Sequence, residues 1–155
     1  EIVTLRGNVE TRFRKIQEGD AHGTLLALAG IKRLKAHYMI GEVLEISTIL
    51  PAVAQGAIGV ACRADDRSVI EQLSPLNHWE TAVCIQAERA FLQELDGNCR
   101  TPIAAYAFLE NNKMCLTGLW ASVDGKRVIK EKASFLIEDA LLQAKHLAQS
   151  IKKHF

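Results

Sequence analysis

The sequence predicts two kinds of fold in one chain, an α/β segment at the start and an α+β domain after it. A strand pattern at 2–5, a helix pattern from Asn8 and an apolar run at 23–29 together make one β–α–β unit. A long amphipathic helix pattern, three strand patterns joined by turn signals and a last helix pattern follow from residue 77. The second part is therefore an antiparallel sheet covered by helices.

The first part begins with the abrupt strand pattern of residues 2–5. Asn8 is a suitable N-cap for the next helix, whose apolar residues recur at helical spacing. Residues 23–29 are almost continuously apolar, which is typical of a strand buried in a parallel sheet. Two further extended stretches and a short helix are expected at 42–50, 57–62 and 65–73. A parallel sheet of two strands cannot bury both its faces, so this unit is incomplete by itself.

The second part begins with Asn77–Glu80, which resembles a capping box, and the helix is expected to end at Gly97 in a left-handed conformation. Strands are expected at 103–110, 114–123 and 127–134. The pairs Asn111-Asn112 and Asp124-Gly125 between them are turn signals. The last helix carries an apolar face made of Ile137, Ala140, Leu141, Ala144, Leu147, Ala148 and Ile151.

Composition narrows the possible classes of protein. Of the 155 residues, 48% are hydrophobic and 24% charged, which is typical of a globular protein. No apolar run approaches eighteen residues, so no transmembrane helix and no membrane partner are expected, and the start lacks the pattern of a signal peptide. A net charge of +1 does not indicate that the chain binds nucleic acid, so no nucleic-acid partner is expected. Basic side chains outnumber acidic ones in residues 1–35, which favours a small anionic ligand or simply a solvated basic face.

The cysteines fall into two groups. Cys62, Cys84 and Cys115 lie within apolar patterns and are expected to be buried. No Cys-x-x-Cys spacing occurs, so no metal site is expected, and a reducing cytoplasm is the simplest compartment. Cys99 instead follows Gly97 in a loop between helix and strand patterns, and the loop is expected to present its thiol at an exposed corner. By itself this thiol is as consistent with an idle cysteine as with a functional one.

Several segments accompany this loop in a fixed order. They are LRGNVETR at 5–12, AGIKRL at 29–34, PAVAQGAIGV at 51–60, LNH at 76–78 and ERAFL at 88–92. In this order and at these separations the chain resembles the porphobilinogen deaminase (hydroxymethylbilane synthase) family, enzymes that join pyrroles in tetrapyrrole and heme biosynthesis. The resemblance spans essentially the whole chain. The sequence departs from the family at Asn98, where a second glycine is usual before the cysteine.

The resemblance implies a domain organisation. Family members have two α/β domains similar to periplasmic binding proteins, with the active site between them, and a third α+β domain that carries a cofactor cysteine. By motif, 1–50 match the later part of domain two, 51–74 the hinge and a return segment of domain one, and 77–155 domain three. We therefore expect a C-terminal fragment of a parent enzyme that works as a monomer. Open sheet edges would let the fragment itself dimerise.

The resemblance also implies site residues. Cys99 matches the cysteine that holds a dipyrromethane cofactor through a thioether, on which porphobilinogen is condensed stepwise into hydroxymethylbilane. A thiolate suits this attachment, because porphobilinogen becomes an electrophile when it loses ammonia. The acetate and propionate arms of the pyrroles suit guanidinium groups. The implied carboxylate-binding residues are Arg6, Asn8, Arg12, Ala29, Gly30 and Arg33. The family's catalytic aspartate matches no segment here, so no catalytic residue is visible and the fragment alone is expected to be inactive.

Two other functions stay open. Half of a domain similar to periplasmic binding proteins could bind an organic anion without catalysing a reaction. A cysteine hydrolase would pair Cys99 with a histidine, but none of the five lies in a motif with an orienting partner: His22, His37, His78, His146 and His154. Without the resemblance, Arg12 is a solvated helix residue, Arg33 a cation at the end of a short helix, and Glu88-Arg89 an ion pair.

Overall fold

The computed structural model describes residues 1–97 and 101–154. Contacts within the chain separate it into two units, Glu1–Glu45 and Ile46–Phe155. This division does not test the predicted domain boundaries, so 1–50, 51–74 and 77–155 stay predictions.

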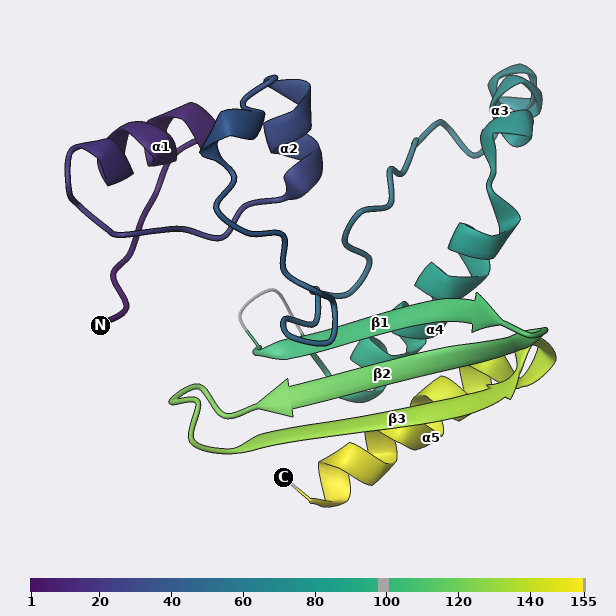
Figure 1. The fold of residues 1–155 in the computed structure, drawn as a ribbon. Helices are drawn as coiled ribbons and strands as arrows, with labels where there is room; N and C mark the ends of the chain where they lie inside the picture. The colour runs from purple at the N-terminus through teal and green to yellow at the C-terminus, as the bar shows by residue number, and fades with distance from the viewer. Residues whose placement is uncertain (98–100, 155) are drawn as a thin grey trace. The chain divides into compact units, whose positions relative to one another are not determined.

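The unit Glu1–Glu45 is built from short helices (Figure 1). They are α1 (Val9–Gln17), α2 (Leu28–Arg33) and a 3-10 turn at His37–Met39. Asn8 is extended and its Oδ1 accepts a hydrogen bond of 2.8 Å from the Thr11 N–H, so the predicted N-cap is confirmed. The two helices pack together, since a Cβ on Gly30 would lie 3.8 Å from Cγ2 of Val9.

The strands predicted in the first part of the chain are wrong. None of the ranges 2–5, 23–29, 42–50 and 57–62, all within the described residues, forms a strand, and α2 begins inside the second of them. A strand needs neighbouring backbone to accept and donate its hydrogen bonds, and these segments find none. Their apolar side chains are exposed accordingly, with Ile2 at 101% and Ile58 at 89%.

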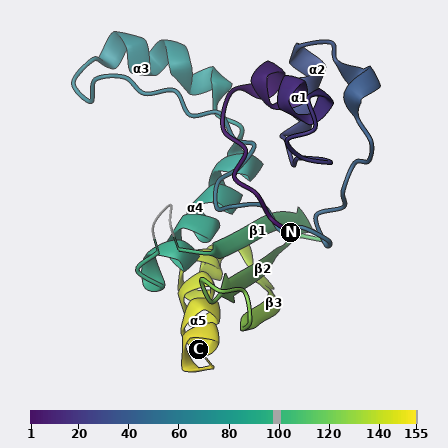
Figure 2. The same ribbon diagram turned by 90° about the vertical axis from the view of Figure 1, so that its left-hand side faces the viewer.

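The unit Ile46–Phe155 contains the sheet. Its helices and strands are α3 (Arg67–Leu73), α4 (Trp79–Glu94), β1 (Ile103–Glu110), β2 (Lys113–Ala121), β3 (Val128–Leu136) and α5 (Ala140–Lys153), with 3-10 turns at Ser74–Leu76 and Ile137–Asp139. The strands pair antiparallel in the order β1-β2-β3, and α4 and α5 cover one face of the sheet (Figures 1 and 2). The predicted mixed fold with a three-stranded antiparallel sheet is confirmed, and so is the short helix before α4.

The two turns of the sheet differ. Asn111 and Asn112 have φ of 51° and 59° and join the paired residues Glu110 and Lys113, which is the two-residue hairpin that their sequence predicts. The turn at Asp124-Gly125 is longer, because the Ser122 N–H donates to the Arg127 carbonyl over 2.8 Å before pairing resumes. As a result, β2 ends two residues earlier than predicted.

The core lies between the sheet and the two long helices. Its fully buried large side chains are Phe91 of α4, Met114 and Leu116 of β2, and Ile151 of α5. Of the apolar face predicted for the last helix, Ala140, Ala144, Leu147, Ala148 and Ile151 are buried in α5, whereas Ile137 is half-buried in the 3-10 turn before it and Leu141, in the first turn of α5, is 52% exposed. Gly118 on β2 faces the Phe91 ring so closely that a Cβ would overlap Cε2 and Cζ.

We predict that Gly118→Ala lowers the free energy of unfolding by about 1–3 kcal/mol, because the buried ring has no room to move aside. Urea unfolding followed by circular dichroism measures this change. Gly59→Ala is the matched control, since a Cβ there meets nothing within 4 Å. Equal stability of the two variants would contradict the prediction.

Candidate functional site

The connection between α4 and β1, which carries Cys99, begins in a defined helix end. Asp96 has φ of 51°, its N–H donates to the Gln93 carbonyl, and the Gly97 N–H donates to the Leu92 carbonyl, both over 3.1 Å. This is a Schellman motif with Asp96 as its left-handed residue. The prediction that Gly97 supplies the left-handed stop is therefore wrong by one residue.

Gly97 serves a different purpose, which is close approach. A Cβ at this position would overlap Cδ1 of Leu92 and lie 2.7 Å from Cδ1 of Ile103 at the start of β1. On the far side of the connection, the Ala121 N–H donates to the Pro102 carbonyl over 2.9 Å. Both ends of the connection are thus fixed on the sheet. Cys99 itself lies outside the described residues, as do Asn98 and Arg100.

All the predicted carboxylate-binding residues lie in the unit Glu1–Glu45. Arg6 and Arg33 are exposed, and no carboxylate of the described residues forms an ion pair with either of them. Arg12 is half-buried and its Nε–H donates to the Gly7 carbonyl over 2.9 Å, which fixes the guanidinium beside the start of α1.

The remaining members of this set lie at the same pair of helices. Asn8 uses its side-chain oxygen for the cap of α1. Ala29 is exposed in the first turn of α2, and Gly30 is half-buried against Val9. The structure therefore brings Asn8, Arg12 and Gly30 onto two packed helices, with the freely solvated Arg33 at the end of the second.

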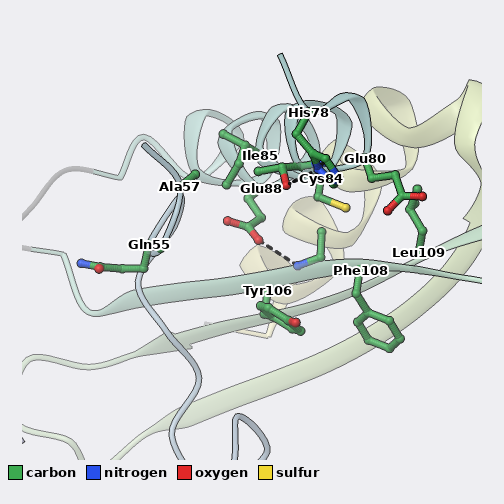
Figure 3. A pocket seen from close by; sticks show the side chains of 13 residues that line it. Gln55, Ala57, His78, Glu80, Cys84, Ile85, Glu88, Tyr106, Phe108 and Leu109 are labelled. Carbon is green, nitrogen blue, oxygen red and sulfur yellow. Dashed lines mark hydrogen bonds between the residues drawn. The ribbon is translucent and has the colours of Figure 1, made fainter. Parts of the chain in front are cut away.

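Sequence reasoning missed the role of Glu88, which is only 4% exposed. Its Oε1 accepts a hydrogen bond of 2.9 Å from the Ala107 N–H of β1 (Figure 3), and its Oε2 accepts one of 2.7 Å from the Ala54 N–H. The predicted ion pair with Arg89 is therefore wrong. The available signal was spacing, because Glu88 falls between Cys84 and Phe91 on the buried side of α4.

A shallow pocket of about 390 Å³ lies beside Glu88, between α4, β1 and residues 55–57 (Figure 3). Cys84 lines it, and burial, reinforced by the charges of Glu88 and Glu80, raises the pKa of this thiol. A protonated thiol is a poor nucleophile. His78 lines it too, but its Nδ1 caps α4 at the Thr81 N–H over 3.4 Å, so the cap lies one residue after the predicted Asn77.

The cysteines of the described residues differ in burial. The predicted burial is confirmed for Cys84 and Cys115 and wrong for Cys62, which is exposed because the strand expected around it does not form. Within residues 1–97 and 101–154, no three His, Cys, Asp or Glu side chains gather closely enough to hold a metal ion. No helix in the same part of the chain has the length and apolar character needed to cross a membrane.

Comparison with known proteins gives two family models that match this chain. "Porphobilinogen deaminase, dipyromethane cofactor binding domain" matches residues 1–71, and "Porphobilinogen deaminase, C-terminal domain" matches residues 82–153. The resemblance inferred from the motifs is thereby confirmed.

Several curated proteins are similar along most of the chain. The chloroplastic porphobilinogen deaminase of Oryza sativa subsp. japonica is 54% identical over 129 residues, which cover 83% of this chain and 36% of that protein. The chloroplastic porphobilinogen deaminase of Pisum sativum is 50% identical over 149 residues (94% and 40%), and the porphobilinogen deaminase of Syntrophotalea carbinolica is 44% identical over 151 residues (97% and 48%). The chain thus spans half or less of the length of these relatives.

The buried carboxyl of Glu88 predicts a specific pH dependence. Burial raises its pKa above the ordinary glutamate value, although the two backbone hydrogen bonds partly oppose this. Between the unfolded and the folded pKa the folded state holds a proton that the unfolded state has lost, so stability falls as the pH rises through this interval. A folded pKa that exceeds the unfolded pKa by one corresponds to about 1.4 kcal/mol of stability lost across the interval.

Urea unfolding from pH 4 to 8 measures this effect as the difference between wild type and Glu88→Gln. We expect the stability of wild type relative to the variant to decrease as the pH rises through the folded pKa, and to stay level above it. A difference that increases with pH would mean that the folded pKa is lowered instead.

Proposed function

Because the chain belongs to the porphobilinogen deaminase family, we propose that it forms part of a transferase of tetrapyrrole biosynthesis that deaminates porphobilinogen and condenses it stepwise into hydroxymethylbilane. The observation that carries the proposal is the pair of family matches, which together account for residues 1–71 and 82–153. The relatives named as this enzyme are about twice as long as the matched region or more, so the proposal concerns a whole protein of which this chain is one portion.

The residues of the first unit suit a ligand rich in carboxylates. The cofactor named by the first family match is a dipyrromethane, and its pyrrole rings carry acetate and propionate arms. Arg6 and Arg33 extend into solvent with no carboxylate partner among the described residues, so both can form bidentate hydrogen bonds with such arms. Arg12 keeps further N–H groups beyond the one donated to Gly7. We assign the remaining contacts to Asn8, Ala29 and Gly30.

We assign the covalent attachment to Cys99. Its thiol displaces the amino group of one porphobilinogen: a carbon–sulfur bond forms to the methylene, the carbon–nitrogen bond breaks, and the nitrogen leaves as ammonia with the thiol proton. A second porphobilinogen is joined to the first pyrrole in the same sense, as a carbon–carbon bond replaces its carbon–nitrogen bond and the ring proton leaves with a second ammonia, which gives the dipyrromethane. Once bound, the dipyrromethane supplies the primer to which further pyrroles are joined. Cys84 is less suited to this role, because its burial and the neighbouring carboxylates keep its thiol protonated.

We also propose a substrate, a compartment and an oligomeric state for the whole protein. Porphobilinogen is the proposed substrate, and the cytoplasm, as a reducing compartment, suits the free thiols of Cys62, Cys84 and Cys115. We propose that the whole protein works as a monomer. The chain by itself would pair through the open edge of its sheet at β3.

We predict that a full-length protein with this sequence has an intact mass larger than its polypeptide by one dipyrromethane, and that Cys99→Ser removes this increment because serine oxygen is a far weaker nucleophile than thiolate. Mass spectrometry of the two proteins measures the difference. Cys62→Ser, which makes the same change at an exposed thiol of the described residues, is the matched control and should keep the increment. An increment that persists in Cys99→Ser would assign the attachment elsewhere.

We also predict that the 155-residue chain alone consumes no porphobilinogen, because the family's catalytic aspartate has no counterpart in its motifs. A continuous assay of porphobilinogen consumption checks this, with a full-length relative as the positive control. Turnover comparable with that of the control would show that this chain contains the whole catalytic machinery.

A further inference from the structure

Glu88 connects two parts of the chain that belong to different family matches. Its carboxylate accepts from Ala54, which lies within residues 1–71, and from Ala107, which like Glu88 lies within residues 82–153. Neither hydrogen bond is local in sequence, because 34 residues separate Glu88 from Ala54 and 19 separate it from Ala107. The contact is buried, since Glu88 is 4% exposed.

The segment 51–56 is shaped to make this contact. Ala54 has φ of 61°, a left-handed conformation that costs free energy for a residue with a Cβ. The Gln55 N–H donates to the Ala52 carbonyl over 3.1 Å, so the segment forms a tight turn. Val53 packs on the core of the sheet and helices beside it. The hydrogen bond from Ala54 to Glu88 is one of the contacts that favour this turn despite the conformation of Ala54.

The other end of the contact lies at an open edge. β1 is an outer strand of the sheet, and the Ala107 N–H donates to Glu88 rather than to β2. Unpaired N–H groups at such an edge attract other strands. The Glu88 carboxylate therefore takes the place that a neighbouring strand would have at this position, and it joins the turn to the edge without extending the sheet.

We propose that Glu88 is a positioning residue that fixes the segment 51–56 to the edge of the C-terminal sheet through one carboxylate shared by two backbone amides. Both oxygens of an ionised carboxylate accept hydrogen bonds, whereas an amide side chain has one acceptor and two donors. A glutamine would therefore leave one backbone N–H facing another donor. An aspartate is shorter by one methylene and cannot reach both amides.

The consequence for the cofactor rests on the proposed function. α4 and β1 flank the connection that carries Cys99, so Glu88 ties a turn of the first family match to the two elements on either side of that connection. The two hydrogen bonds of Glu88 therefore fix the turn at 51–56 relative to α4 and β1, and the connection between α4 and β1 carries the proposed attachment residue Cys99.

Amide hydrogen exchange on the 155-residue chain tests the bridge without reference to cofactor or turnover. In Glu88→Gln we expect at least one of the Ala54 and Ala107 amides to exchange about ten- to a hundredfold faster, because the single side-chain oxygen of glutamine can replace only one of the two lost acceptors. The buried Leu116 amide of β2 serves as the internal reference and should change less. Glu80→Gln is the matched control, since it makes the same substitution two turns earlier on an exposed part of α4.

Amide exchange in Glu88→Asp is a second test, and it still tests the proposal when Glu88→Gln does not fold. This variant keeps the negative charge, but its side chain is shorter, so at least one of the Ala54 and Ala107 amides should lose its protection from hydrogen exchange. Unchanged exchange at Ala54 and Ala107 in the variants would overturn the proposal. Equal acceleration at Leu116 would overturn it as well, because Glu88 would then stabilise the fold as a whole rather than position the turn. Neither result would bear on the mass increment at Cys99, so the two proposals fail separately.

Discussion

The close packing of Phe91 against Gly118 is the contact on which the rest of the C-terminal unit depends. Because Gly118 has no side chain, the Phe91 ring can lie directly on β2 and bring α4 against the sheet. That approach has two consequences. Glu88, one turn earlier on the helix, reaches the backbone of β1, and the last turn of α4 reaches Ile103 at the start of the same strand. The ends of the Cys99 connection are therefore set by core packing rather than by the connection itself.

The α+β domain could be predicted because its local signals agree with its tertiary structure. Two asparagines supply the positive φ angles of a two-residue hairpin, and the periodic apolar residues of α5 face the core. The strands expected before residue 63 could not be predicted correctly, because a strand depends on backbone partners that its own sequence does not contain. In residues 23–29 the apolar pattern suits a buried strand, yet without a sheet the end of this run starts α2. The local sequence pattern determines which secondary structure is favoured, and the backbone partners available in the folded chain determine which one forms.

The candidate site shows the same limit at the level of single residues. Asn8 could be predicted as a cap, since a cap needs only the N–H groups of its own helix. The role of Glu88 could not, because its partners are backbone amides far away in sequence, and a charged residue beside an arginine suggests a surface ion pair. The predicted burial of Cys62 fails for a related reason, because it requires a strand with a sheet to pack on. Both of these errors came from a partner that local sequence does not specify.

The two units differ in how large a buried core they have. Within Glu1–Glu45 the buried apolar side chains are Ile31 and Ala36, whereas Ile46–Phe155 has a continuous core. Regions with few buried contacts open more readily than those with many. The covalent attachment proposed at Cys99 would allow no change of partner, so its anchor is best placed between two elements of a packed core, and α4 and β1, which flank residue 99 in the chain, are such elements. In the proposed function, the guanidinium groups must instead release and rebind the carboxylates of a lengthening pyrrole chain. The exposed Arg6 and Arg33, on a unit with little core, suit that second task.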